Sequence, residues 1–111
     1  MPKPKLYFKY DIPTTVVEIV KTLCADYNRR ERAIKFSNVT GDVLARYVQL
    51  NAVIDKALEE VEVGIRKDIL QDIQKRRGYD FSTAAECISK NTYYRRKRKL
   101  IYDIAKGLAL L

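Results

Sequence analysis

A strongly basic segment near the carboxyl end holds the residues whose types and spacing suit binding to a polyanion. Residues 89–106 contain seven Lys or Arg and one acidic residue, Asp103, so this segment carries +6 of the formal net charge of +8. Arg can form a bidentate pair with guanine O6 and N7, Asn can do the same with adenine, and both Lys and Arg neutralise phosphates. The segment therefore has the chemistry of a nucleic-acid-binding surface, with a solvated basic helix face as the alternative.

Helical periodicity divides this segment into two faces. At 3.6 residues per turn, one side of a helix over residues 90–108 carries Tyr93, Leu100, Ile104 and Leu108, with Ile101 at its margin. The opposite side carries Asn91, Arg95, Arg98 and Tyr102. We expect the first group to pack in the core and the second to face a partner. Lys97 falls on the apolar side, so its ammonium must extend along the core surface to reach a polar environment.

The amino end of a helix that enters the major groove lies deepest against the bases. This geometry singles out four candidates for base edges or adjacent phosphates: Lys90, Asn91, Tyr94 and Arg95. Thr92 and Arg98 would lie beside the sugar-phosphate backbone. Four further residues are candidates for phosphate contacts: Arg76, Arg77, Arg96 and Lys99. Since a helix C-terminus attracts basic residues through its dipole, a structural role for Arg76 and Arg77 is the favoured alternative.

The composition excludes most catalytic sites. The chain has no histidine, which removes Ser/His/Asp and Cys/His nucleophile systems, HExxH metal sites and every zinc site that uses imidazole. Asp68 and Asp72 lie four residues apart, but with no third ligand or glycine loop we expect surface ion pairs and no metal. Cys24 and Cys87 form no CxxC pair and are expected to be small buried hydrophobes. We therefore expect no enzyme and no cofactor.

The remaining sequence predicts an all-α fold in a single domain. At 111 residues, 47% hydrophobic and 32% charged, the chain suits one compact domain, and all three prolines precede residue 14. Residues 1–13 are expected to be an N-terminal arm, and residues 14–111 a single helical DNA-binding domain of five helices. These helices are predicted from Thr14 or Thr15 to about residue 36, then at 42–60, 63–76, 83–88 and 90–108.

Capping residues and charge refine these boundaries. A hydroxyl of Thr14 or Thr15 should cap the first helix, Gly78 should stop the third, and Ser89 should cap the last. Asp80 or Ser82 should cap the short helix. Residues 40–62 carry two positive and five negative charges, so their acidic face is expected to point to solvent. A short helix, a brief turn and a long basic helix at about 80–108 are the order of a helix-turn-helix motif.

Three stretches of the sequence resemble small phage-encoded transcriptional regulators of the ArpU and RinA type. They are Leu50-Asn-Ala-Val-Ile-Asp-Lys-Ala-Leu58, the segment 65–73, and residues 88–108. The sharpest element is Ile-Ser-x-x-Thr-x-Tyr-Arg-Arg, which begins at Ile88 and continues to Ile-Ala-x-x-Leu at 104–108. The carboxyl half of these regulators is similar to region 4 of sigma factors. Residues 1–39 are not covered by the resemblance.

The resemblance implies a sequence-specific binder of promoter DNA and no catalysis. It implies activation of late phage or prophage genes, contact with RNA polymerase, and a location in the cytoplasm of a bacterial host, on the nucleoid. Carried over position by position, the recognition helix would use Lys90, Asn91, Thr92, Tyr94, Arg95 and Arg98. The supporting helix at 83–88 is shorter than the family pattern.

Two other functions fit the same features. The first is a DNA-packaging subunit similar to a small terminase, and the second is a non-enzymatic adaptor whose basic helix binds an acidic protein. A homodimer is also possible, joined through the first helix or the apolar tail Leu108–Leu111, although the tail fits equally well within a monomer. No apolar segment of about 20 residues and no signal peptide is present, so we expect no membrane partner and a cytoplasmic protein.

Overall fold

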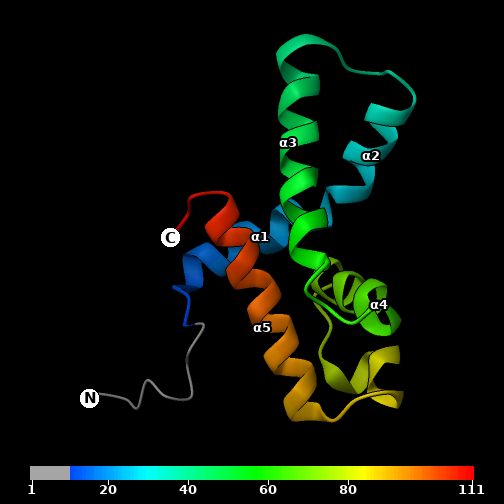
Figure 1. The fold of residues 1–111 in the computed structure, drawn as a ribbon, viewed down its shortest axis with the longest axis vertical. Coiled ribbons are helices and arrows are strands. Elements are labelled where there is room, and N and C mark those ends of the chain that lie inside the picture. Colours follow the sequence, from blue (N-terminus) through cyan, green and yellow to red (C-terminus); the bar gives the residue numbers. More distant parts are fainter. Residues whose placement is uncertain (1–10) are drawn as a thin grey trace.

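The computed structural model describes residues 11–111, and these form helices and connecting turns with no strand among them. Figure 1 shows the α-helices, which are α1 (Thr14–Ala25), α2 (Tyr27–Lys35), α3 (Gly41–Leu58), α4 (Val63–Gln74) and α5 (Lys90–Gly107). Two short 3-10 turns, Tyr79–Phe81 and Thr83–Glu86, connect α4 to α5. The prediction of an all-α fold is confirmed. Of the predicted arm, residues 1–13, only residues 11–13 are described.

The hydrophobic core lies where α1, α4, α5 and the carboxyl half of α3 meet; we call this part the body. Its fully buried side chains come from all four helices and from the connection before α5: Val20, Cys24, Ile54, Ile69, Ile73, Ala84, Tyr93, Leu100 and Ile104. Removal of this apolar surface from water is the main source of stability. Among helices of the described residues, none is long and apolar enough to cross a membrane.

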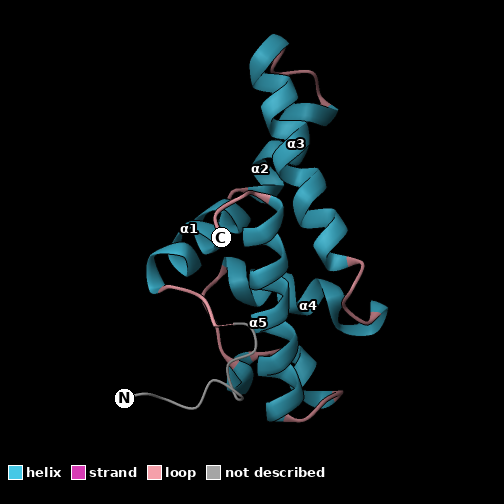
Figure 2. Ribbon diagram, turned by 60° about the vertical axis from the view of Figure 1, so that its left-hand side comes forward, coloured by secondary structure: helices cyan, strands magenta, loops and turns pink. Residues whose placement is uncertain are grey.

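The α2 helix and the amino half of α3 project from the body as a helical hairpin (Figures 1 and 2). The buried residues of α3 begin only at Asn51, more than two turns into the helix. Phe36, Val43 and Val48 on the projecting part are 62%, 49% and 47% exposed. The hairpin thus reaches well beyond the core that holds α5.

The predicted single first helix is in fact two helices, because a polar network interrupts it after Ala25. Asp26 leaves the helical conformation, and its carboxylate accepts two hydrogen bonds from Arg29, at 2.6 and 2.5 Å. This pairing lowers the pKa of Asp26. The guanidinium of Arg30, 2% exposed, turns back and donates to the Leu23 carbonyl at 2.7 Å. Burial lowers the pKa of Arg30.

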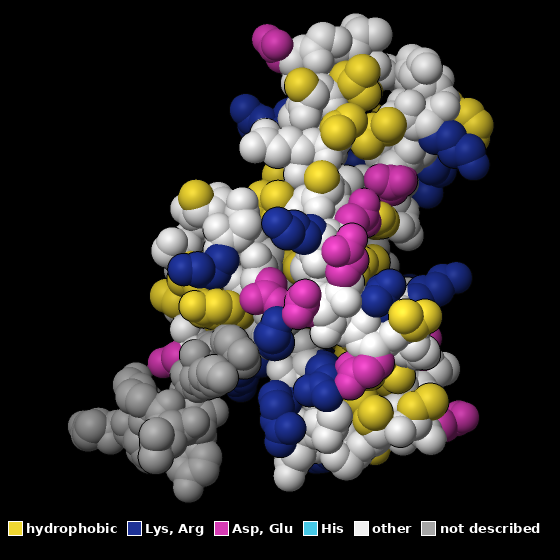
Figure 3. All heavy atoms as spheres, viewed as in Figure 1, with side chains coloured by type: hydrophobic (Ala, Val, Ile, Leu, Met, Phe, Trp, Pro, Cys, Tyr) yellow, Lys and Arg dark blue, Asp and Glu magenta, His cyan; other side chains and the backbone are white. Residues whose placement is uncertain are grey.

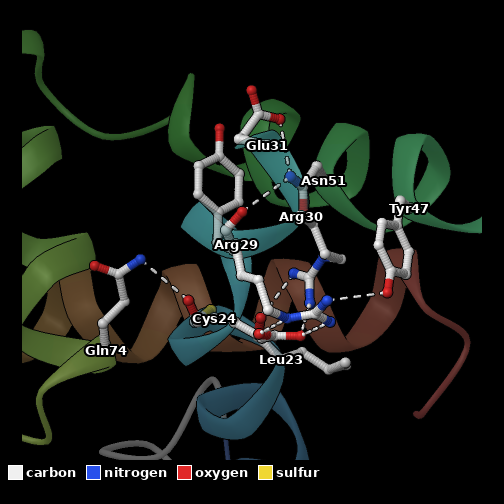
Figure 4. A network of polar contacts seen from close by, with 10 residues as sticks. Leu23, Cys24, Arg29, Arg30, Glu31, Tyr47, Asn51 and Gln74 are labelled. Carbon is white, nitrogen blue, oxygen red and sulfur yellow. Dashed lines mark hydrogen bonds and ion pairs between the residues drawn. The ribbon is translucent and has the colours of Figure 1, made fainter. Parts of the chain in front are cut away.

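Asn51 of α3 completes this network (Figure 4). Its side-chain oxygen accepts from Nε of Arg30 at 2.7 Å, and its amide donates to the Tyr27 carbonyl and to Glu31, at 3.2 and 2.8 Å. A buried Arg and a buried Asn are stable only when their polar atoms are bonded in this way. The network therefore fixes the angle at which the hairpin leaves the body.

The boundaries of α3, α4 and α5 agree with the sequence prediction to within two residues, although two capping predictions are wrong. Pro13, rather than a threonine hydroxyl, is the N-cap of α1. At the end of α4, Arg76 adopts a left-handed φ of 56°, and the Arg77 N–H bonds to the Asp72 carbonyl at 2.8 Å. Gly78 is not the left-handed residue; a Cβ there would lie 2.9 Å from the Tyr94 hydroxyl, which would have to shift to make room for it.

The predicted helix at 83–88 is also wrong as an α-helix, since the segment forms only the 3-10 turn Thr83–Glu86. Ser82 caps this turn, as predicted, by accepting from the Ala84 N–H at 3.0 Å. The Tyr79 hydroxyl lies 3.2 Å from the Ala85 carbonyl and 2.9 Å from the Ile88 carbonyl. These contacts link Tyr79 to the 3-10 turn and to the segment between that turn and α5. The helix-turn-helix motif therefore stays a prediction.

Candidate nucleic-acid interface

The helix that carries the predicted contacts, α5, begins at the predicted cap. Ser89 accepts a hydrogen bond from the Thr92 N–H at 3.3 Å, and its hydroxyl also bonds to the Thr92 hydroxyl at 3.1 Å. Tyr93 is fully buried, as predicted, together with Leu100 and Ile104. These contacts fix both the start and the rotation of α5, and hence which side chains it presents outward.

A buried carboxylate anchors the first turn of α5 to the end of α4. Asp72 is 0% exposed, and it accepts from the Tyr93 hydroxyl at 2.9 Å and from Arg77 at 3.1 Å. Burial, and then the Asp72 hydrogen bond, raise the pKa of Tyr93. The expectation that Asp72 makes a surface ion pair is wrong, because Asp72 itself is fully buried between Tyr93 and the half-buried Arg77. The sequence held one signal for this contact: Tyr93 was predicted to be buried, and a buried tyrosine hydroxyl needs a hydrogen-bond partner.

Lys97 reaches along the core surface as its position on the apolar side required. Its ammonium donates to the Arg77 carbonyl at 2.6 Å and lies 5.5 Å from the centroid of the Tyr93 ring. Burial and the neighbouring charge of Lys21 lower the pKa of Lys97. Lys97 thus joins α5 to the turn after α4, and its side chain is half-buried.

A second side of α5 faces carboxylates at the α3–α4 connection. Arg96 binds both oxygens of Glu62 at 2.7–2.9 Å, and this pairing lowers the pKa of Glu62 to about 2. Lys99 bonds to Asp103 at 2.7 Å and lies 3.9 Å from Glu60. The acidic side chains of this segment are exposed, as expected, and two of them, Glu60 and Glu62, also pair with α5. In Figure 3, acidic side chains lie beside the basic ones along α5.

All four predicted phosphate contacts form ion pairs within the chain. Besides the pairs of Arg96 and Lys99, Arg76 bonds to Glu18 of α1 at 2.8 Å, and Arg77 bonds to the buried Asp72. A cation paired with a carboxylate attracts a phosphate less strongly than an unpaired one does. These ion pairs fit the structural role that the sequence favoured for Arg76 and Arg77, and phosphate contact by the four residues stays a prediction.

The third side of α5 is open, and it carries most of the predicted base contacts. Asn91, Arg95 and Arg98 are exposed, and Tyr94 is 40% exposed; the spacing of these residues places them on one helical face. Lys90 is exposed in the first turn. Thr92 lies instead on the side of Arg96 and Lys99, and its hydroxyl is bonded to Ser89. Of the six residues predicted for the recognition helix, the structure thus exposes all except Thr92 on or beside this face.

Within the open face, the residues differ in how firmly they are held. The Tyr94 hydroxyl accepts a hydrogen bond from the Tyr79 N–H at 3.1 Å, and its ring lies edge-on to Tyr93 at 4.9 Å. The side chains of Lys90, Asn91 and Arg95, by contrast, make no hydrogen bond or ion pair with any residue in the described part of the chain. Their polar groups are available to a ligand.

The cysteines and acidic residues show no sign of a second chemistry. Cys24 is buried, as predicted, and burial raises its pKa to about 12, so its thiol is protonated at neutral pH. Cys87 is exposed, which corrects the expectation that it is buried. Within residues 11–111, no three His, Cys, Asp or Glu side chains are grouped so that they could hold a metal ion.

The chain was also compared with known proteins by three routes. A scan against protein-family models, a search of curated proteins and a search of solved structures each found no match.

Proposed function

We propose that this protein is a sequence-specific, double-stranded DNA-binding transcriptional regulator that places the open face of α5 in the major groove. The observation that carries the proposal is the contrast between the sides of α5. Arg96 and Lys99 are neutralised by carboxylates, whereas Asn91 and Arg95 project with no partner among the described residues. These two side chains match adenine and guanine edges.

The way α5 is supported also fits this function. The helix has 18 residues, about 27 Å in length, and is long enough to cross a major groove. The Ser89 cap, the Tyr93–Asp72 hydrogen bond and the Lys97–Arg77 contact hold its amino half against α4. Because base readout depends on side chains that start from a fixed position, this rigidity favours discrimination between sequences over loose charge attraction.

The regulatory part of the proposal rests on the resemblance to regulators of the ArpU and RinA type. It comprises activation of phage or prophage late genes, contact with RNA polymerase, and the helix-turn-helix role of residues 80–108. Binding as a homodimer belongs to the same proposal, since two copies on adjacent half-sites gain affinity and specificity. The protein would then act on the nucleoid of a bacterial host.

Selection of bound duplexes from a random DNA pool, at roughly physiological salt, tests this function. Nonspecific charge attraction fades steeply as salt rises, so an enriched sequence motif supports a regulator. Two repeated half-sites about one helical turn apart would support a dimer. A pool without enrichment contradicts sequence-specific binding.

Measurement of the oligomer separates the rival functions in that case. A ring-sized assembly in light scattering would favour the DNA-packaging subunit. A monomer or dimer with weak duplex affinity, indifferent to sequence, would favour an adaptor that binds an acidic protein.

A further inference from the structure

A groove runs beside the open face of α5, where α1 crosses it. Its volume is about 230 Å³, and both apolar and basic side chains line it. The apolar side chains are those of Ile12, Val17 and Ile101, and the polar ones, which we call the rim, are those of Lys21, Tyr94, Lys97 and Arg98. Tyr94 and Arg98 belong to the open face as well, so the groove continues the surface of the proposed DNA contact onto α1.

The charges on this rim are of one sign. Lys21 comes from α1 and Lys97 from α5, and no carboxylate is among the described residues that line the groove. Lys21 makes no hydrogen bond or ion pair with any described residue. The nearest buried carboxylate, Asp72, is already bonded to Arg77 and Tyr93. Lys21 and Lys97 therefore both line this space, and Asp72, the carboxylate whose charge acts on Lys97, is not among the lining residues.

Their proximity has an energetic cost. The positive charge of Lys21 contributes, after burial, to the lowered pKa of Lys97. Like charges at the edge of a low-dielectric surface repel each other more strongly than in bulk water, and a bound anion would turn this repulsion into attraction. The groove is thus prepared for a negatively charged group of modest size.

We propose that this groove binds a phosphate of the DNA backbone and that Lys21 supplies the contact from α1. The inference rests on the proposed function and names a contact outside the recognition helix. A phosphate fits better than an isolated small anion because Arg98 and Tyr94 link the groove to the face that would follow the duplex. In protein–DNA complexes, such phosphate contacts fix the register from which base-reading side chains act.

The test compares duplex affinity at several salt concentrations for the wild type, Lys21→Gln and Lys21→Arg. The probe is a fluorescent 30-base-pair duplex of mixed sequence, followed by anisotropy between 50 and 200 mM KCl. Loss of one phosphate contact should weaken binding about three- to tenfold near 0.1 M salt, and should reduce the slope of log affinity against log salt by about 0.9. Lys21→Arg keeps the charge and should retain the wild-type slope.

A matched control is Lys35→Gln, which removes one exposed lysine from α2, on the projecting hairpin. It should leave both affinity and salt slope unchanged. If the wild type binds the duplex and Lys21→Gln binds equally well with the same slope, the groove assignment is overturned while the proposed function stands.

A second arm separates DNA from an acidic protein partner. If the wild type binds poly-glutamate but not the duplex, and Lys21→Gln weakens that binding, the groove accepts carboxylates and both the phosphate assignment and the proposed function fail. Lys21 is only half-buried, so we expect each variant to fold. Thermal melting monitored by circular dichroism verifies this.

Discussion

Residues of the same type on α5 have different roles because their neighbours differ. Arg96 is held by Glu62 and connects α5 to the α3–α4 turn, whereas Arg95, the preceding residue, projects from the open face. Helical periodicity predicted that Arg95 faces outward. It did not predict the pairing of Arg96, since Glu62 is 34 residues away in sequence and meets it only through tertiary packing.

Substitution of the open-face residues tests base readout. Asn91→Ala or Arg95→Ala should cost about 1–3 kcal/mol of binding free energy on the selected sequence and relax the preference at one base pair, because a bidentate contact is lost. The measurement is the affinity for a set of duplexes that each carry one base-pair change. Equal weakening on every sequence would instead make the residue a phosphate contact.

Removal of the buried carboxylate should destabilise the fold without a change at the surface. Asp72→Ala leaves the Arg77 charge and the Tyr93 hydroxyl without their acceptor and should lower the unfolding free energy by about 3–5 kcal/mol. Tyr93→Phe removes a single hydrogen bond, at a cost of about 1–3 kcal/mol. Urea unfolding measures both effects. Asp68→Ala, which removes a half-buried aspartate from the same helix, serves as control and should stay within about 1 kcal/mol of the wild type.

The contribution of the Arg96–Glu62 ion pair to the unfolding free energy should depend on pH. Arg96 lowers the pKa of Glu62 from 4.5 to about 2, so the pair stabilises the folded state above pH 4.5. This contribution declines as pH falls from 4.5 toward 2, where the folded carboxylate takes up its proton. Glu62→Gln should therefore flatten the dependence of unfolding free energy on pH within this window. An unchanged profile would show that the pair does not form in solution.

At the scale of elements, local sequence signals predicted most helix boundaries. The Ser89 cap and the apolar spacing of α3, α4 and α5 place each boundary within two residues. The break between α1 and α2 escaped prediction because the buried contacts of Arg30 with Leu23 and Asn51 cause it, and no local pattern encodes them. The segment 83–88 forms a 3-10 turn instead of the predicted helix, and it is packed against Tyr79, whose hydroxyl lies near the Ala85 and Ile88 carbonyls.

Three helices end in a left-handed residue that is not glycine, namely Ser37, Arg76 and Ala109, at φ of 56°, 56° and 60°. After Ser37, the Asn38 N–H closes the helix end on the Ala33 carbonyl at 2.9 Å. Left-handed backbone is strained for residues with a Cβ, so Ser37→Gly and Ala109→Gly should each raise the unfolding free energy by about 0.5–1 kcal/mol.

Gly41→Ala provides the opposite control for that prediction. Gly41 also has a φ of 60°, and no atom lies within 4 Å of the position its Cβ would take. Any destabilisation, expected at about 1 kcal/mol, would therefore arise from the backbone alone. Chemical denaturation of the three variants measures the sign of each change in unfolding free energy. A Gly41→Ala variant more stable than the wild type would contradict the backbone explanation.

At the scale of the whole molecule, the distribution of charge is more even than the sequence indicates. Residues 89–106 hold +6 of the net charge, yet Glu60 and Glu62 lie against them and reduce the exposed positive potential. The excess is concentrated on the open face of α5 and on the groove beside α1. Composition could predict an attraction to polyanions, but only the fold determines where on the surface that attraction is strongest.

The projecting hairpin makes different parts of the chain open on different timescales. Before Asn51, the amino half of α3 has no buried residue and packs against α2, whereas α5 is held by the core. Backbone amides near Val43 and Val48 should therefore exchange with solvent deuterium through local opening, far faster than those near Leu100 and Ile104, which require global unfolding. The bonds of Asn51 mark the boundary between these regimes, so the outer part of the hairpin can unravel and re-form while the face of α5 stays in place.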